Sequence, residues 1–368
     1  MLRRLVLAAV LLAAPVGCMD LSGVASAIDD ARAVAKIGVV AHPEVSWPAS
    51  AARLKKCLAF FKSKKVDAIV VIGDLTHDGY LNQYRVIAQA WDDVFRNPVK
   101  GIDPNPPRRI FVLGPRDRER FRPEFAAPLE PDLSVEGGEF EVNGFRFRAT
   151  AGRPEAGDAP AFFADGKPAL TDELCWYPRT RIELNAGSLS GVVPRAGYES
   201  VKSAASASQG LLVTAYSGSL AVSRIDFGDG SPVAEDWRIS LSPDAPRQRL
   251  DDRAPEFWAD TTLRVMPGEE PGKGRSYKVE WPPVLAKHTG VRAYSYEVEA
   301  LIASSDGERQ VVAKRLYVLS PNFWRSEDRD AAPVSCRFYA ADLPSTGEVR
   351  FRVTPVSCSG ERGRPISN

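Results

Sequence analysis

Histidine and cysteine are scarce in this chain of 368 residues, which has three histidines and five cysteines. No Cys-x-x-Cys pair and no cysteine and histidine at zinc-finger spacing is present, so a structural zinc domain is excluded. The histidines are His42, His77 and His288. Because each ion of a two-metal site takes about four or more ligands, three histidines spread over the whole chain argue against a histidine-rich pair of metal sites.

An excess of charge of one sign is also absent. Lysine and arginine number 48 against 47 aspartate and glutamate residues. Such a balance gives no electrostatic reason to expect an acidic polymer as a partner, and we expect no nucleic acid. Hydrophobic residues make up 44% of the chain, which is ordinary for a globular protein, and the length allows roughly two domains with a sizeable core.

The one marked apolar run at the N-terminus is Leu5–Val16, which follows the basic start Met1-Leu2-Arg3-Arg4. It is shorter than the roughly twenty apolar residues of a membrane span, and a basic start before a short apolar core is typical of a secretory signal. We therefore predict that residues 1–27 are a signal peptide and that the protein is exported.

Two processing sites compete in this segment. Val16-Gly17-Cys18 resembles the end of a bacterial lipoprotein cleavage box, whereas Ala25-Ser26-Ala27 has the small-x-small pattern of an ordinary signal site. The first predicts a cell-envelope lipoprotein, whose membrane contact is only the lipid on Cys18. The second predicts a soluble periplasmic or secreted protein that starts at Ile28.

A buried strand that ends on Gly73-Asp74 is the most informative stretch of the chain. Residues Ala68–Ile72 are apolar and rich in β-branched side chains, without the polar alternation of a half-exposed strand. We expect two similar strands and two amphipathic helices around it, in the order strand Lys36–Ala41, helix Ala49–Lys64, strand Ala68–Ile72, helix Leu81–Arg96 and strand Arg109–Leu113. Such a βαβαβ unit makes right-handed crossovers, so the carboxyl ends of the three strands should meet at one rim.

Ionisable residues follow each of these strands. The five candidate cleft residues are His42, Glu44, Asp74, Arg116 and Asp117. Ligands of open α/β sheets bind outside the carboxyl ends of the strands, so this rim is the predicted site. His77 lies in a glycine-flanked loop and is interpreted as a loop residue rather than a ligand.

The stretch Val71–Gly79 resembles the Gly-Asp block of the calcineurin-like metallophosphoesterases, and the spacing of the flanking strands fits that family. The resemblance implies a layered β-sheet sandwich flanked by helices over residues 28–242. The other metal-binding blocks differ. This chain has His42-Pro43-Glu44 in place of Asp-x-His and Gly114-Pro115-Arg116-Asp117 in place of Gly-Asn-His-Asp, and the later histidine blocks are shortened or missing before Asn185.

The resemblance leaves two alternatives for the site. In the first, one divalent ion (manganese, iron or zinc) is bound by Asp74, His42 and Glu44, with Asp117 as a further candidate. In the second, which we favour, no metal is bound, because Pro115 offers no ligand atom and Arg116 is a permanent cation. Arg116 would then neutralise Asp74 or Asp117 in place of the ion.

A run of alternating arginines follows the third strand, at Arg116, Arg118, Arg120 and Arg122. It is interpreted either as a solvated rim or as an anion clamp. We favour the rim, because charge runs are usually solvated.

The C-terminal part reads as short alternating strands after a linker over residues 243–254. Residues 255–368 are predicted to form an all-β sandwich that resembles fibronectin type III and immunoglobulin-like domains. Cys336 and Cys358 both lie in this part and could form a disulfide in an exported protein. Cys57 lies on the apolar face of the first helix and is expected to be buried.

From these features we predict an exported protein with a decayed metal site that acts as a non-catalytic pseudoenzyme. Its unknown ligand or protein partner would bind through the cleft or the C-terminal sandwich. The alternative is an active metal-dependent phosphohydrolase that cleaves phosphate esters with the reduced site.

Overall fold

The computed structural model describes residues 33–48, 50–96, 103–152, 159–164, 182–191, 198–199, 208–233, 236–242, 253–285, 291–303, 310–324, 332–344, 348–357 and 360–368. The predicted signal peptide with Cys18 and most of the predicted linker lie outside these residues, as do Cys175, His288 and Cys358. Among the described residues, no helix has the length and apolar character needed to cross a bilayer.

The predicted βαβαβ unit is confirmed. Its elements are β1 (Ala35–Ala41), α3 (Ala51–Ser63), β2 (Ala68–Gly73), α4 (Leu81–Phe95) and β3 (Arg108–Leu113). The three strands are parallel, with Val39 opposite Val70 and Val70 opposite Ile110. Their carboxyl ends therefore lie at one rim of the sheet, as the order of the elements predicts.

This sheet continues on both sides of the parallel strands. It has eight strands, which run in the order β12-β11-β10-β1-β2-β3-β4, with β13 also paired to β11. The added strands are β4 (Leu133–Ser134), β10 (Gln209–Ala215), β11 (Ser219–Asp226), β12 (Ser231–Pro232) and β13 (Trp237–Ser240). β10 is antiparallel to β1, so the parallel unit forms only the centre of a mixed sheet.

A second sheet contains β5 (Gly138–Val142), β6 (Phe145–Thr150), β7 (Ala161–Phe163) and β8 (Glu183–Asn185). Asn143 and Gly144 join β5 to β6 in a hairpin: both residues have positive φ, 50° and 83°, as a two-residue hairpin turn requires. The last strand of this sheet, β8, is short. It ends at Asn185, because the chain then turns toward β1, where the Leu189 N–H donates to the Ala41 carbonyl.

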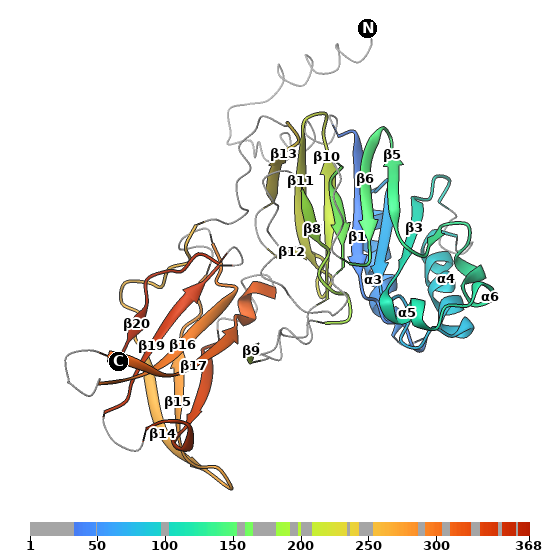
Figure 1. The fold of residues 1–368 in the computed structure, drawn as a ribbon. Helices are drawn as coiled ribbons and strands as arrows, with labels where there is room; N and C mark the ends of the chain where they lie inside the picture. The colour runs from blue at the N-terminus through green and yellow to red at the C-terminus, as the bar shows by residue number, and fades with distance from the viewer. Residues whose placement is uncertain are drawn as a thin grey trace, which may run out of the picture.

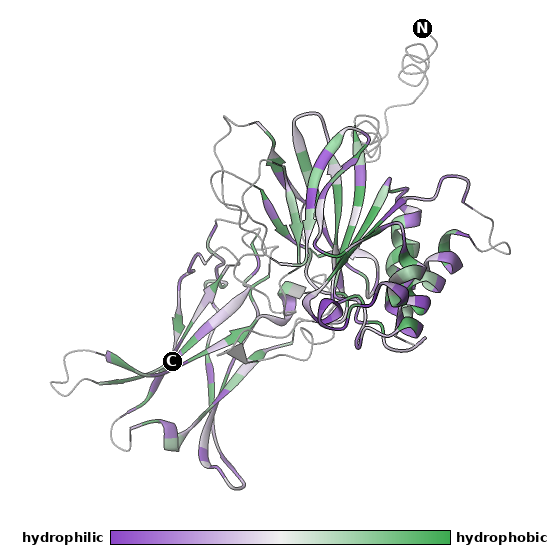
Figure 2. Cartoon of the chain, turned by 45° about the vertical axis from the view of Figure 1, so that its right-hand side comes forward, coloured by the Kyte–Doolittle hydropathy of each residue, from purple (hydrophilic) through white to green (hydrophobic). Residues whose placement is uncertain are grey.

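The central sheet is buried on both faces. Ile69 and Val71 of β2 pack in an apolar cluster with α3 and α4, whereas Val70 and Ile72 pack in another with the second sheet. Figure 1 shows this layering, with helices on one side of the central strands and β5 and β6 on the other. Figure 2 shows the hydrophobic residues concentrated in the central strands. Burial on both faces explains why β2 lacks polar alternation.

Each of the two long helices buries one face, as expected of the amphipathic helices predicted here. The buried residues of α3 are Ala51, Leu54, Cys57, Leu58 and Phe61, and those of α4 are Gln83, Tyr84, Ile87, Ala90, Trp91 and Phe95. The burial expected for Cys57 is confirmed, and it raises the pKa of the thiol. The other helices among the described residues are short: α5 (Pro115–Glu119), α6 (Pro123–Ala126) and the 3-10 turns Ala127–Leu129, Pro321–Trp324 and Ala340–Asp342.

Lys65, just after α3, is an exposed residue with a φ of 52°, and its N–H donates to the Lys62 carbonyl. Left-handed backbone is strained for side chains other than glycine. We expect Lys65→Gly to raise the free energy of unfolding by about 0.5–1 kcal/mol in urea denaturation. The matched variant Lys64→Gly, where φ is −85°, should lower it by a similar amount, because glycine there adds only unfolded-state entropy. Equal effects of the two variants would contradict this assignment of strain.

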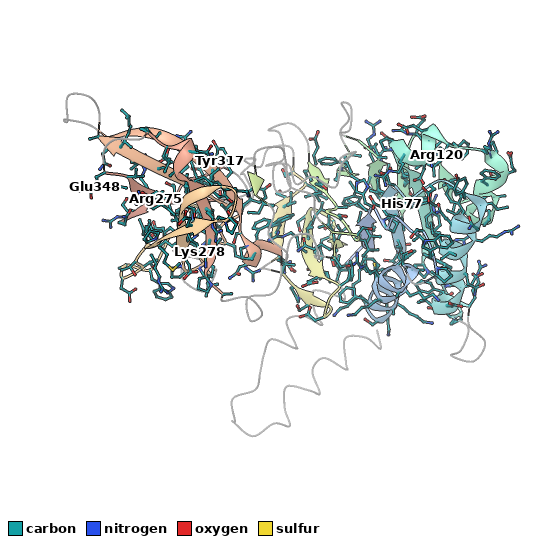
Figure 3. The ribbon with its side chains drawn as sticks, turned by 90° about the horizontal axis from the view of Figure 1, so that it is seen from below. His77, Arg120, Arg275, Lys278, Tyr317 and Glu348 are labelled. Atoms are coloured by element: carbon teal, nitrogen blue, oxygen red, sulfur yellow. The ribbon has the colours of Figure 1, made fainter. Side chains whose placement is uncertain are left out.

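The C-terminal part forms a β-sandwich. One sheet contains β14 (Arg264–Glu270), β15 (Gly274–Trp281) and β18 (Val334–Tyr339). The other contains β9 (Tyr198–Glu199), β16 (Ser295–Ala303), β17 (Gln310–Leu319), β19 (Arg350–Val356) and β20 (Ile366–Ser367). Trp281, Tyr296 and Phe338 are among the large side chains buried between them. Figure 3 shows the sandwich with Tyr317 and Glu348 labelled, and the α/β part with His77 and Arg120 labelled.

The sandwich and the mixed sheet are packed against each other. The apolar cluster between the two sheets of the α/β part also includes Tyr294, Leu319 and Phe323 of the sandwich. The guanidinium of Arg224 lies over the rings of Phe323 and Trp237, at 4.3 and 5.3 Å from their centroids. In addition, β9 pairs in parallel with β17. Residues from both parts therefore share one core.

Candidate functional site

The loops after β1 and β2 run side by side beyond the ends of the strands. The His42 N–H donates to the Ile72 carbonyl at 2.9 Å and the Glu44 N–H to the Asp74 carbonyl at 3.1 Å. The Val45 N–H then donates to the Leu75 carbonyl at 2.9 Å. Pairing past the strand ends places His42 and Glu44 beside Asp74, as the convergence of strand ends predicts.

The backbone at this rim is strained and crowded. His42 and Glu44 have φ values of 48° and 44°, a left-handed conformation that costs of order 1 kcal/mol or more for each such residue. Two glycines leave room for the functional side chains: a Cβ on Gly73 would lie 2.7 Å from His42 Cε1, and one on Gly114 would lie 2.3 Å from Asp74 Oδ1. Side chains at these two positions would collide with the candidate site.

His42, Glu44 and Asp74 form a compact cluster. Each offers one ligand atom, and these atoms lie within 4.8 Å of one another. His42 and Asp74 are only 1% and 3% exposed, and Glu44 is half-buried. The Asp74 N–H donates to His42 Nδ1 at 3.3 Å. Since Nδ1 accepts, this hydrogen bond assigns the proton of a neutral imidazole to Nε2.

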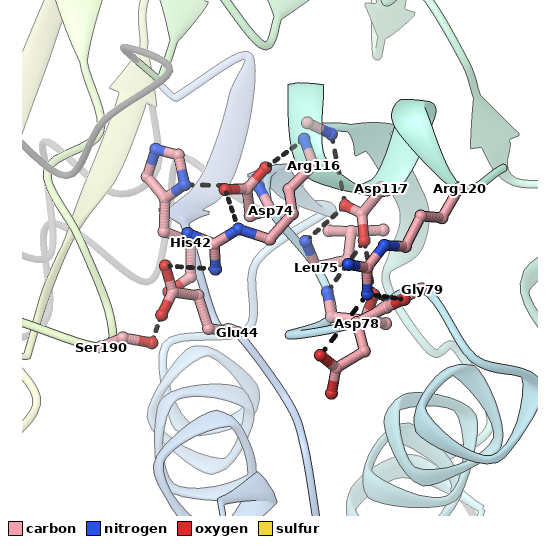
Figure 4. A network of polar contacts seen from close by, with 12 residues as sticks. His42, Glu44, Asp74, Leu75, Asp78, Gly79, Arg116, Asp117, Arg120 and Ser190 are labelled. Atoms are coloured by element: carbon pink, nitrogen blue, oxygen red, sulfur yellow. Dashed lines mark hydrogen bonds and ion pairs between the residues drawn. The ribbon is translucent and has the colours of Figure 1, made fainter.

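Arg116 lies against the same carboxylates. Its Nε is 3.7 Å from Asp74 Oδ2, its Nη1 is 3.5 Å from Glu44 Oε1, and its backbone N–H donates to Asp74 Oδ1 at 3.1 Å. Figure 4 shows the guanidinium between the two carboxylates. Of the two partners predicted for Arg116, the structure shows an ion pair with Asp74, and it adds Glu44.

Asp117 faces a different group of atoms from the cluster. Its carboxylate accepts hydrogen bonds from the Leu75, Thr76 and Gly114 amides at 2.7, 3.1 and 3.3 Å, and from Thr76 Oγ1 at 2.6 Å. Burial raises the pKa of the Asp117 carboxyl, although these hydrogen bonds act to lower it. Asp117 thus ties the loop after β2 to the loop after β3, and its oxygens are engaged there rather than with His42, Glu44 and Asp74.

Three further residues contact the site, Ser190, Thr76 and Tyr84, and the sequence does not predict their contacts. Ser190 Oγ donates to the His42 carbonyl at 2.7 Å, and the hydroxyl of Tyr84 lies 3.4 Å from Asp117 Oδ1. Ser190 is far from His42 in the chain, and no spacing rule joins the two. His77 is exposed, in agreement with its interpretation as a loop residue.

The fold and the site define a mixed α/β protein with an imidazole, two carboxylates and a guanidinium at the carboxyl ends of parallel strands. This architecture is compatible with a metallophosphoesterase-like core. No protein-family model and no curated protein matches the chain.

Three solved structures align with 56% of this chain. One is a conserved uncharacterised protein from Streptococcus pneumoniae described as a predicted phosphoesterase, with 13% identity, 97% of its own length covered and a TM-score of 0.34. Another is GAP50, described as the anchor in the inner membrane complex of Plasmodium, with 12% identity, 89% covered and a TM-score of 0.36. The third is Vacuolar Protein Sorting 29 from Cryptosporidium parvum, with 13% identity, 98% covered and a TM-score of 0.35.

Proposed function

We propose that this protein is a non-catalytic, ligand- or partner-binding member of the metallophosphoesterase-like folds, in which Arg116 replaces a metal ion. The position of the guanidinium carries the proposal, because it lies within 4 Å of both Asp74 and Glu44. An arginine side chain stays protonated at every physiological pH. It therefore supplies permanently the positive charge that the two carboxylates need.

The donors of the cluster suit a divalent ion chemically, but each is already engaged. Both Asp74 oxygens face Arg116, one Glu44 oxygen does as well, and His42 Nδ1 accepts the Asp74 N–H. An ion would have to displace the guanidinium and one hydrogen bond. The side chain of Arg116 is 41% exposed, so it has solvent to move into.

A second candidate, a hydrolase of phosphate esters with a single ion, is supported by the 4.8 Å grouping of three ligand atoms and by the two strained residues that hold it. Strained backbone is concentrated at functional sites. Asp74, His42 and Glu44 would hold the ion, which would polarise a phosphoryl oxygen as a Lewis acid.

Two further proposals accompany this function. The N-terminal sequence supports export, with either a lipid on Cys18 or a soluble mature chain. The alternating strands of the sandwich support a fibronectin type III-like domain, which offers a second surface for a partner. Cys336 is buried in β18; its bridge to Cys358 remains a prediction, because Cys358 lies outside the described residues.

Arg116→Gln tests the replacement of a metal by arginine. We expect manganese or zinc to bind the variant about tenfold more tightly than the wild-type chain in calorimetry, because a partly screened unit charge beside the ion is removed. The double variant Arg116→Gln with Asp74→Asn is the matched control and should lose this gain. Thermal unfolding with and without metal gives the same comparison independently of any substrate.

The opposite result would favour the hydrolase. In this case the wild-type chain would retain one metal ion after desalting, and Arg116→Gln would leave the affinity for that ion unchanged. Both results together would show that the guanidinium does not occupy the position of the ion. A screen of phosphate esters would then be expected to give turnover that disappears in Asp74→Asn.

A further inference from the structure

A separate hollow is lined in part by the loop that follows β2. It has a volume of about 420 Å³, and its lining residues include Tyr80, Phe121 and Phe125. This volume falls within the range of about 300–1,000 Å³ that small-molecule sites occupy. Tyr80 is 54% exposed, whereas the two phenylalanines are half-buried against the helices. Aromatic walls of this kind suit a flat or bulky apolar group.

The alternating arginines near this hollow differ in their pairing. Three of the four form ion pairs with carboxylates of this chain: Arg116 with Asp74 and Glu44, Arg118 with Glu136, and Arg120 with Asp78. Arg122 is exposed and lines the hollow, and it forms no ion pair within the described part of the chain. A guanidinium in such a position can bind a carboxylate with two parallel hydrogen bonds.

An acidic side chain lines the same hollow. Glu119 is exposed and, among the described residues, forms no ion pair, including none with Arg122. Asp78 and Arg120 also line the hollow, but they pair with each other at 3.7 Å, as Figure 4 shows. The hollow therefore offers one carboxylate and one guanidinium to a ligand. A ligand that satisfies both carries one positive and one negative charge.

We propose that this hollow binds a free α-amino acid with an aromatic or large apolar side chain. Its carboxylate pairs with Arg122, its ammonium pairs with Glu119, and its side chain packs against the rings of Tyr80, Phe121 and Phe125. The site goes beyond the proposed function and does not depend on it, since none of these residues belongs to the cluster of His42, Glu44 and Asp74. A ligand with one charge would leave either Arg122 or Glu119 unpaired.

The test is a titration of the full chain with L-phenylalanine, in which calorimetry or ligand-observed NMR detects binding. We expect binding in the micromolar to millimolar range, and about tenfold weaker binding for Arg122→Gln and for Glu119→Gln, because each loses a charge-assisted hydrogen bond. Arg118→Gln is the matched control, since that arginine pairs with Glu136 and does not line the hollow. It should bind phenylalanine as the wild type does.

Ligands that lack one of the two charges test each ion pair by a change in the ligand instead of the protein. L-Phenylalaninamide lacks the carboxylate and should bind Arg122→Gln and wild type equally; N-acetyl-L-phenylalanine lacks the ammonium and should be insensitive to Glu119→Gln. The three substituted side chains are largely at the surface, so the melting temperatures of the variants should match that of the wild type. Absence of phenylalanine binding, binding of both blocked ligands as tight as that of phenylalanine itself, or loss of binding in Arg118→Gln would overturn the proposal.

Discussion

Asp117→Ala should lower the free energy of unfolding by about 3–5 kcal/mol, the largest effect that we expect from a single polar substitution in the α/β part. The Asp117 carboxylate is fully buried and accepts hydrogen bonds from three amides and two hydroxyls. Its removal leaves the Leu75 and Thr76 donors without an acceptor inside the protein. Each unsatisfied buried donor costs about 1–3 kcal/mol. Urea denaturation of the full chain measures the loss.

Two further variants serve as an intermediate case and as a control for this prediction. Asp117→Asn keeps one acceptor oxygen but turns an NH₂ group toward backbone donors, so it should fall between the wild type and the alanine variant. Glu136→Ala removes an exposed carboxylate whose only described ion pair is with Arg118, and it should change stability by less than about 0.5 kcal/mol. If Asp117→Ala cost no more than Glu136→Ala, the carboxylate would not be the link between the two loops.

Glu299→Gln should destabilise the sandwich by about 2–3 kcal/mol at neutral pH. Glu299 is 2% exposed, and each of its oxygens binds a different arginine through two nitrogens. Arg315 contacts Oε1 at 3.1 and 2.6 Å, and Arg352 contacts Oε2 at 2.8 and 2.6 Å. An amide can satisfy only one of these pairs, and its NH₂ group would face the other guanidinium. Thermal or urea unfolding measures the effect.

The same carboxylate predicts a pH dependence. Burial alone raises the pKa of Glu299, but the hydrogen bonds from Arg315 and Arg352 outweigh it and hold the pKa below its ordinary value of 4.5. A carboxyl group whose pKa is lower in the folded than in the unfolded state stabilises the protein at pH values above its unfolded-state pKa. This stabilisation is lost as the pH falls through the folded-state pKa.

The difference in the free energy of unfolding between wild type and Glu299→Gln should therefore be largest above a pH of about 5 and should decrease below it. Glu348→Gln serves as the control, because Glu348 is 78% exposed and pairs with Arg350 at 3.5 Å; it should show almost no difference at any pH. A difference for Glu299→Gln that stayed constant from neutral to acidic pH would contradict the assignment.

The placement of Asp74 could be predicted because it depends on local sequence. An uninterrupted β-branched run that ends on Gly-Asp, followed by an amphipathic helix, specifies a buried parallel strand with a carboxylate at its end. His42 and Glu44 follow from the same argument applied to β1. The βαβαβ order then brings the three residues to one rim without any knowledge of their contacts.

The partners of Arg116 and Asp117 could be predicted only in part. These residues are adjacent at the start of the short helix α5, and neighbouring helical residues point in different directions. Which of them faces Asp74 depends on the rotation of α5, and a five-residue helix has no apolar stripe that would fix it. The contact of Ser190 with His42 depends on how a distant loop returns to β1, which no local pattern encodes.

The stacking of Arg224 between Trp237 and Phe323 has a consequence for how the chain can be divided. The apolar core of the mixed sheet includes Tyr294, Leu319 and Phe323 of the sandwich. The contact between the two parts is therefore a buried apolar interface rather than a hinge. A fragment that ends at residue 242 would expose the apolar surface that the sandwich covers, and Arg224 would lose its contact with Phe323. We therefore expect the two parts of this protein to unfold together, because side chains of the sandwich complete the apolar core beneath the sheet that carries the site.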